Sequence, residues 1–377
     1  MIELRGITWD HVRGWGGLRA AADAYARKRD DVQVTWETRS LQAFADRPVE
    51  DLVRYDLIVL DHPSIGEAVG RGAVVALDEH LGPELLDEQR SASVGRSFES
   101  YGWGGHQWAL PVDAAAQVAA YRPDLIDRAG VDIPRTWEDV LRAAAVLAER
   151  RARIAMPAIA VDAVCAFLAI CAAPFEADGV VEREPGRRAL AILRDVIEVA
   201  HPMSLELDPP TLLASMTETD EVAYCPLAFG YVTFARDEAS SRALRFAPAP
   251  ALTGTLGGAG IAVSSGSSHI EEACSFAAFA TSSDVQRGVY VDGGGQPGHR
   301  AAWTDPEVDA WANGFFSATL PALDAAYLRP RHDGFLSFQD AAGELINAYL
   351  RDDGDPDAVL DAIDAADRVS RMSEAER

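Results

Sequence analysis

Near its start, the chain alternates between strand-like and helix-like segments. Residues 6–9 have the character of a short strand, and apolar residues then recur at helical spacing over 18–25. Residues 32–37 alternate apolar with polar side chains, and 57–60 is a continuous apolar run, which is typical of a strand buried on both faces. A β-α-β series favours parallel pairing, because the connecting helix crosses back over the sheet. We therefore predict an α/β fold of mostly parallel sheets flanked by helices.

The length of the chain favours two lobes over one. It has 377 residues, whereas a single hydrophobic core stops growing at roughly 250–300 residues. Apolar residues make up 48% of the sequence and charged residues 25%, which is the balance of a folded globular protein. We expect two folded lobes of ordinary size.

Several helix starts carry recognisable signals. Thr136 with Asp139 and Ser268 with Glu271 have the spacing of a capping box. Asp355 followed by Pro356 is typical of the first residues of a C-terminal helix. These signals predict helices that begin just after Thr136, Ser268 and Asp355.

The net charge excludes several classes of partner. The sequence has 34 Lys and Arg residues against 59 Asp and Glu residues, which gives −25. A field of that sign repels phosphate backbones and anionic lipids, so we expect no nucleic acid partner, no membrane insertion, and a ligand that is neutral or cationic rather than polyanionic. Lys28 is the single lysine and lies in a charged run at the end of a helix, which argues against Schiff-base chemistry and a phosphate-loop lysine.

The cysteines and the first residues bear on the compartment. Cys165, Cys171, Cys225 and Cys274 show neither a CxxC motif nor the spacing of a disulfide framework, which predicts buried thiols. Residues 1–5 lack the basic and apolar regions of a signal peptide, and no apolar stretch is long enough to span a bilayer. As written, the chain is expected in the cytoplasm; it would be extracytoplasmic if a leader has been removed.

An ordered run of motifs lies in the first half of the chain. The segment YGWGGHQWALPVD at 101–113 is followed by YRPDL at 121–125, AGV at 129–131 and PRTWED at 134–139. This order resembles the family 1 extracellular solute-binding proteins of ABC importers, the maltose-binding type. Weaker similarity extends over nearly the whole chain, at residues 56–61, 75–78, 260–263, 271–273, 286 and 295–300.

The resemblance implies a class II periplasmic-binding-protein fold, in which two α/β lobes close on a ligand in the cleft between them. An N-terminal lobe would comprise residues 1–112 plus 259–303, and a C-terminal lobe 113–258 plus 304–377. The chain would cross between the lobes near residues 112, 258 and 304. An ABC permease would be the protein partner.

Two of the expected strands end with the same pair of polar residues. Asp10 and His11 follow the first strand, and Asp61 and His62 follow the apolar run at 57–60. Ligands of open α/β sheets bind beyond the carboxyl ends of the strands. If these two strands are parallel neighbours, both pairs face one cleft.

Four interpretations of these pairs are open. They could hydrogen-bond the hydroxyl groups of a ligand. They could be structural, with Asp61 capping a helix near Ser64 and Asp10 capping one near Gly16. They could also form a metal site, or an acid–base pair in an enzyme.

Aromatic and hinge residues complete the predicted site. Aromatic planes pack against the C–H faces of sugar rings, and Trp and Tyr keep a polar edge for hydroxyl groups. We interpret the glycine-rich segment 13–17 as a loop that presents Trp15, and Gly258 as a point of close backbone approach. For Tyr224 and Tyr231, a place in a core is equally open. The predicted ligand-binding residues are Trp9, Asp10, His11, Arg13, Trp15, Asp61, His62, Asp113, Tyr224, Phe229, Tyr231, Gly258 and Gln296.

The expected function is the binding of a small polar solute, a carbohydrate or a sugar-like molecule. The chain would be the substrate-binding component of an ABC importer or a leaderless cytoplasmic relative, with no catalytic residue, cofactor or metal. The alternative is a cytoplasmic enzyme on the same scaffold that uses the Asp–His pairs as acid and base. Cys225 is the cysteine that could serve such an enzyme as a nucleophile.

Overall fold

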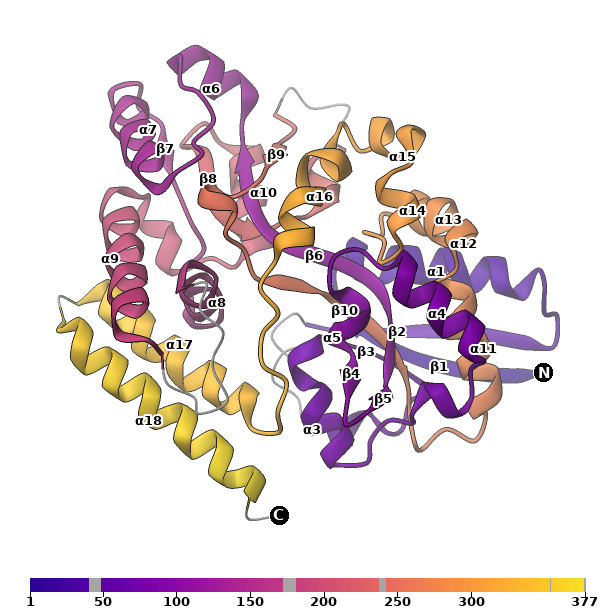
Figure 1. Ribbon diagram of the computed structural model, residues 1–377. Coiled ribbons are helices and arrows are strands. Elements are labelled where there is room, and N and C mark those ends of the chain that lie inside the picture. The colour runs from indigo at the N-terminus through magenta and orange to yellow at the C-terminus, as the bar shows by residue number, and fades with distance from the viewer. Residues whose placement is uncertain (41–48, 172–180, 237–241, 353, 376–377) are drawn as a thin grey trace. The chain divides into compact units, whose positions relative to one another are not determined.

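The computed structural model describes residues 1–377 except 41–48, 172–180, 237–241, 353 and 376–377 (Figure 1). The chain divides into two compact units. Unit 1 comprises residues 1–115, 257–311 and 331–333, and unit 2 comprises residues 116–256, 312–330 and 334–377. The sequence predicts that the chain crosses between the lobes near residues 112, 258 and 304. It does not predict the short return of the chain to unit 1 at residues 331–333.

The sheet of unit 1 begins with the parallel strands that the sequence predicts. β1 (Ile2–Trp9) pairs in parallel with β2 (Val32–Arg39) and with β3 (Leu57–Leu60). β10 (Leu256–Val263) pairs antiparallel with β3, and β6 (Ala109–Tyr121) is next in order. The α/β class is confirmed, but the sheet is mixed rather than mostly parallel, because β10 runs against its neighbour β3.

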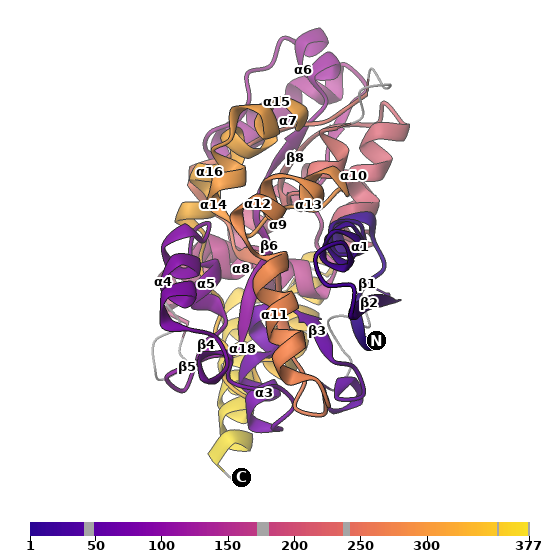
Figure 2. The ribbon, with the colours of Figure 1, turned by 90° about the vertical axis from the view of Figure 1, so that its right-hand side faces the viewer.

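Helices cover both faces of this sheet. Alternate residues of β3 pack with α1 (Val12–Ala26) and α11 (Ile270–Ala280), which lie beside one another on one face (Figure 2). The other residues of β3 pack with α3 (Ile65–Gly70). No residue of β3 is more than 2% exposed, which confirms a strand buried on both faces. The other elements of unit 1 are β4 (Gly102–Trp103), β5 (His106–Gln107), α4 (Pro83–Ala92), α5 (Ser97–Ser100), α12 (Ser283–Arg287), α13 (Val289–Asp292), α14 (Arg300–Trp303) and α15 (Pro306–Trp311).

The start of α1 packs closely on the end of α13. A Cβ atom on Gly16 would collide with the carbonyl oxygen of Gly293, and one on Gly17 would collide with the Tyr290 ring. The prediction of a loop at 13–17 is therefore wrong, because these residues form the first turns of α1. Glycine weakens an isolated helix, but here it permits a backbone approach that no larger residue would allow.

Unit 2 contains a short mixed sheet among helices (Figure 1). β6 runs antiparallel to β8 (Val222–Phe229) and β9 (Arg245–Ala247), and β7 (Arg153–Ile154) pairs in parallel with β8. The core of this unit is built around α8 (Ala160–Cys171). At least seven residues of this helix belong to one apolar cluster. The other helices are α6 (Pro123–Ala129), α7 (Trp137–Glu149), α9 (Arg183–Val199), α10 (Pro209–Glu218), α16 (Phe315–Ala325), α17 (Phe335–Arg351) and α18 (Pro356–Ala375).

All four cysteines are free and buried, which confirms the prediction of buried thiols. In the described part of the chain, no helix has the length and apolar character needed to cross a lipid bilayer.

A buried carboxyl group lies in the first turn of α8. The Asp162 side chain belongs to a residue that is 4% exposed, and its Oδ2 atom has no hydrogen-bond partner among the described residues. Burial and the negative charge of Asp208 raise the pKa of Asp162 to about 8, although Arg329 opposes the rise. The folded protein therefore keeps a proton at neutral pH that the unfolded chain releases.

We expect Gly16→Ala to lower the free energy of unfolding by about 1–3 kcal/mol, because the added methyl group forces α1 away from Gly293. Urea unfolding measures this change. Gly82→Ala is the matched control, since a Cβ atom at Gly82 meets no atom within 4 Å. Equal stability of the two variants would contradict the close packing of α1 on α13.

We expect Asp162→Asn to flatten the dependence of stability on pH. Between the unfolded pKa of 3.8 and the folded pKa of about 8, the folded state holds more protons, so stability falls as pH rises, by up to about 1.4 kcal/mol per pH unit. The variant cannot titrate and should lose this slope, becoming more stable than the parent at pH 7.5. Urea unfolding from pH 5 to 8 measures the effect, with the exposed Asp195→Asn as the control. An unchanged slope in Asp162→Asn would show that the buried carboxyl does not control it.

Candidate ligand-binding site

The two predicted Asp–His pairs follow neighbouring strands of unit 1. Because β1 and β3 pair in parallel, Asp10 and Asp61 lie at the same edge of the sheet, beyond the carboxyl ends of the strands. Asp10 is exposed, and the side chain of Asp61 keeps 31% of its surface exposed. The structure therefore brings these two carboxylates to the edge where ligands of α/β sheets bind.

His11 holds the first turn of α1. It is the N-cap residue, and its Nδ1 atom accepts a hydrogen bond of 3.1 Å from the backbone N–H of Arg13. The prediction that Asp10 caps this helix is therefore wrong by one residue. Since Nδ1 is the acceptor, the proton of the neutral ring is on Nε2, which becomes a donor. His11 is half-buried.

Asp61 caps the short 3-10 turn His62–Ser64. Its Oδ1 atom accepts a hydrogen bond of 2.8 Å from the backbone N–H of His62, which supports the capping interpretation for Asp61. The His62 side chain is fully buried, with its Nδ1 atom 3.1 Å from Asp61 Oδ1 and its ring edge-on to Tyr101 at 6.5 Å. The His62 ring is therefore enclosed in the protein and presents no surface of its own to a ligand.

A buried ion pair joins α1 to β6. Arg13 donates from Nε to one carboxylate oxygen of Asp113 at 2.9 Å and from NH2 to the other at 2.5 Å, and the two side chains are 4% and 0% exposed. Burial raises the pKa of the Asp113 carboxyl, Arg13 opposes that rise, and the negative charge of Asp61 adds to it. This influence places Asp61 in the same electrostatic cluster. The charge of Arg13 is already matched by Asp113, so Arg13 is a structural residue of this edge.

Gly258 and Gln296 hold the backbone of β6 at this point. Gly258 has φ 106°, and a Cβ atom there would collide with the carbonyl oxygen of Asp113. Gln296 is buried, and its Nε2 atom donates to the carbonyl oxygen of Ala114 at 2.8 Å. The backbone at Gly258 does approach another group closely, as predicted, and that group is the backbone of β6.

The two tryptophans of the predicted site differ in their surroundings. Trp9 is 5% exposed and belongs to the core of unit 1, where its ring packs against Gly14. Packing in this core therefore explains the presence of a tryptophan at position 9 without a ligand contact. Trp15 is half-buried on α1, and the guanidinium of Arg19 lies 4.5 Å from the centre of its ring. Trp15 stays a predicted ligand residue, presented by a helix.

The three predicted residues of unit 2 lie on or just after β8. Tyr224 is fully buried in the core of unit 2, and it lies opposite Tyr121 of the neighbouring strand β6. This burial favours the core interpretation for Tyr224. Phe229 ends β8 and is half-buried. Tyr231 is 6% exposed and meets Phe234 edge-on at 6.2 Å. Phe229 and Tyr231 stay predictions for unit 2.

The buried Cys225 thiol lacks the character of a nucleophile. Burial raises the pKa of the Cys225 thiol to about 12, so the thiol is protonated at neutral pH and is a poor nucleophile. Within the described ranges, no group of three or more His, Cys, Asp or Glu side chains is arranged to hold a metal ion.

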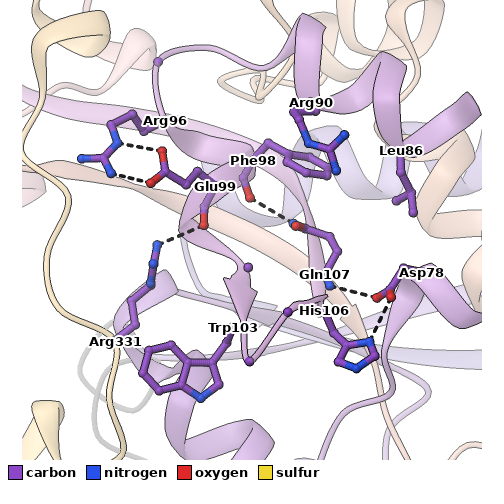
Figure 3. Close-up of a pocket in the computed structure, with 14 residues that line it drawn as sticks. Asp78, Leu86, Arg90, Arg96, Phe98, Glu99, Trp103, His106, Gln107 and Arg331 are labelled. Carbon is purple, nitrogen blue, oxygen red and sulfur yellow. Dashed lines mark hydrogen bonds and ion pairs between the residues drawn. The ribbon is translucent and has the colours of Figure 1, made fainter. Parts of the chain in front are cut away.

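A hollow of about 720 Å³ in unit 1 was missed by the sequence analysis (Figure 3). It surrounds the β4–β5 hairpin and contains none of the predicted site residues. Its signal lies within the family-like segment 101–113, where Trp103 and His106 flank two consecutive glycines. Arg331, which also lines it, comes from a distant part of the chain.

The chain belongs to the bacterial extracellular solute-binding protein family, whose model matches residues 16–287. This confirms the resemblance found in the motifs at 101–139. No curated protein matches the chain at a significant level.

Solved structures confirm the two-lobed class II periplasmic-binding-protein fold. Maltose-bound MalE3 of T. maritima has a TM-score of 0.83 at 18% identity, over 98% of this chain and 100% of that one. An ABC transporter solute-binding protein of Agrobacterium radiobacter K84, in complex with ribitol, has a TM-score of 0.81 at 21% identity, over 98% of both chains. A solute-binding protein of Thermotoga lettingae TMO, bound with α-D-tagatose, has a TM-score of 0.82 at 16% identity, over 98% of this chain and 100% of that one.

We expect Arg13→Met to lower the free energy of unfolding by about 3–5 kcal/mol, because it leaves the Asp113 carboxylate buried without its partner. The double variant Arg13→Met with Asp113→Leu removes both charges and should recover much of that loss. Urea unfolding of the two variants and the parent measures this. A single variant as stable as the parent would contradict the structural role of the pair.

Proposed function

We propose that this protein binds a small sugar or polyol at the edge of unit 1 marked by Asp10, His11 and Asp61, and delivers it to an ABC permease. Membership of the solute-binding family supports a binding role. The similar structures carry maltose, ribitol and tagatose, and their shared chemistry supports a polyhydroxylated ligand. By its description the family is extracellular, and we propose that this chain acts on the same side of the membrane.

The observation that carries the proposal is the combination of donors and acceptors at the two strand ends. Asp10 and Asp61 offer carboxylate oxygens, which accept hydrogen bonds. His11 accepts the Arg13 backbone N–H through Nδ1, so Nε2 is its donor. A sugar hydroxyl group both donates and accepts, and it therefore matches this set more fully than an ion of either sign.

The charges near the site support a neutral or cationic ligand. The chain carries −25, and two carboxylates lie at the strand ends themselves. Among the described residues, two cations lie near the strand ends: Arg13 is paired with Asp113, and Arg39, beside the end of β1, is buried and donates to the carbonyl oxygen of Val59. A polyanion would meet repulsion both at long range and at the site.

Binding without chemistry is the simpler account of these residues. The buried and protonated Cys225 thiol supplies no nucleophile, and His62 is enclosed in the protein. The closing of two lobes around the ligand, which the resemblance implies, stays a prediction, as do the contributions of Trp15, Phe229 and Tyr231.

We expect thermal unfolding of the protein to shift upward with at least one of maltose, ribitol, D-tagatose and D-mannitol. A ligand at one hundred times its Kd stabilises the folded state by about 2.7 kcal/mol. Asp61→Asn keeps the size of the side chain but removes its charge, and it should weaken binding about tenfold, because hydrogen bonds to a carboxylate are roughly twice as strong as neutral ones.

Asp195→Asn is the control for this experiment, because it removes an exposed carboxylate from unit 2. The recovered sugar should be chemically unchanged after incubation. Conversion of the sugar would favour the enzyme alternative, and equal binding by Asp61→Asn and the parent would place the ligand elsewhere.

A further inference from the structure

The hollow around the β4–β5 hairpin, here called the hairpin pocket, is a second concave surface of unit 1. Its volume of about 720 Å³ lies in the range of small-molecule sites. The residues that line it are Asp78, Leu86, Arg90, Gly95, Arg96, Phe98, Glu99, Gly102, Trp103, Gly104, Gly105, His106, Gln107 and Arg331.

Hydrogen bonds fix the walls of the hairpin pocket. The Asp78 carboxylate accepts a bond of 2.9 Å from the backbone N–H of Gln107 and lies 2.9 Å from Nδ1 of His106. The Gln107 side chain donates to the carbonyl oxygen of Phe98 at 3.0 Å. Trp108 donates from Nε1 to the carbonyl oxygen of Trp103 at 2.8 Å. The hairpin is therefore held in place before any ligand arrives.

Arg331 is the unusual charge of the hairpin pocket. It is half-buried, and its NH1 atom donates to the backbone carbonyl oxygen of Glu99 at 3.0 Å (Figure 3). No carboxylate lies within ion-pair distance of it among the residues that the structure describes. Burial lowers the pKa of Arg331, yet an arginine stays charged at neutral pH. The charge of Glu99 also acts on Arg331, but at a longer distance than an ion pair. A half-buried guanidinium whose hydrogen bond goes to a carbonyl oxygen can pair with the carboxylate of a ligand.

The other arginines of the pocket already have carboxylate partners. Arg96 donates from Nε to Glu99 at 2.8 Å and pairs with it a second time through NH2. Arg90 pairs with Asp87 and lies over the Phe98 ring at 5.1 Å. The carboxylates that line the pocket are Asp78 and Glu99, against three arginines. With Asp87 counted as the partner of Arg90, Arg331 is the arginine of this pocket that no described carboxylate pairs within ion-pair distance.

Trp103 gives the hairpin pocket an apolar surface beside the charge. It is half-buried, and Figure 3 shows its ring on the same side of the hairpin as Arg331. A ring with C–H faces could pack on the indole while a carboxylate on that ring reaches the guanidinium.

We propose that the hairpin pocket is an accessory site for a small organic carboxylate, with Arg331 pairing its carboxylate and Trp103 packing on its apolar face. This site shares no residue with the strand-end site and is independent of the sugar or polyol proposed there. A single carboxylate differs from the polyanions that the net charge disfavours, because one local arginine can neutralise it.

Titration calorimetry with D-glucuronate tests the proposal, with D-glucose as the uncharged probe of the same ring. The parent should bind D-glucuronate at the hairpin pocket, and Arg331→Gln should weaken that binding about tenfold or more, since the bond lost is charge-assisted. Trp103→Ala should weaken it as well. Arg27→Gln removes an exposed arginine from the same unit and should leave binding unchanged.

Two further variants keep the outcome interpretable. Arg331→Lys preserves the charge and should retain part of the affinity if Arg331→Gln folds poorly. Asp61→Asn alters the strand-end site and should leave D-glucuronate binding intact. No binding by the parent, equal binding by Arg331→Gln, or loss of binding in Asp61→Asn would each overturn the proposal. The first two results leave sugar binding at the strand ends untouched, whereas the third would place D-glucuronate at the strand-end site.

Discussion

The buried ion pair between Arg13 and Asp113 is the interaction on which the strand-end region depends. It ties the first turn of α1 to β6 through two hydrogen bonds, with both side chains almost wholly removed from water. Burying two charges is costly unless each is fully bonded to the other, so the geometry around them has to be held tightly. Gly258 and Gln296 supply that support by fixing the backbone of β6. The position of α1 beyond β1 follows from this arrangement.

With that helix in place, the polar residues at the edge divide into two groups. His62 and Arg13 are enclosed, and Arg13 is paired with Asp113, whereas Asp10 and Asp61 keep contact with solvent. The alternatives of a helix cap and a ligand contact therefore turn out not to exclude one another. Asp61 caps a turn with one oxygen and still has an exposed carboxylate surface. Such a cap is a rigid group, and a rigid acceptor loses little freedom when it binds a hydroxyl group.

The parts of the structure that were predictable are those set by local sequence. The apolar run at 57–60 identified a strand buried on both faces, and the capping box at Thr136 forms as expected. The prediction of a second capping box at Ser268 is wrong. The helix α11 begins after His269, and the backbone N–H of His269 donates a hydrogen bond to the Ser267 hydroxyl. The hairpin pocket was not predictable, because Arg331 reaches it from a segment more than two hundred residues away in sequence. The local pattern at 101–113 indicates the hairpin, but tertiary packing decides which arginine reaches it.

A crystal structure of the protein with a bound sugar or polyol is the most direct test of the central claim. We expect ligand oxygen atoms within hydrogen-bond distance of the side chains of Asp10, His11 or Asp61. A well-ordered ligand that contacts none of these three residues would contradict it.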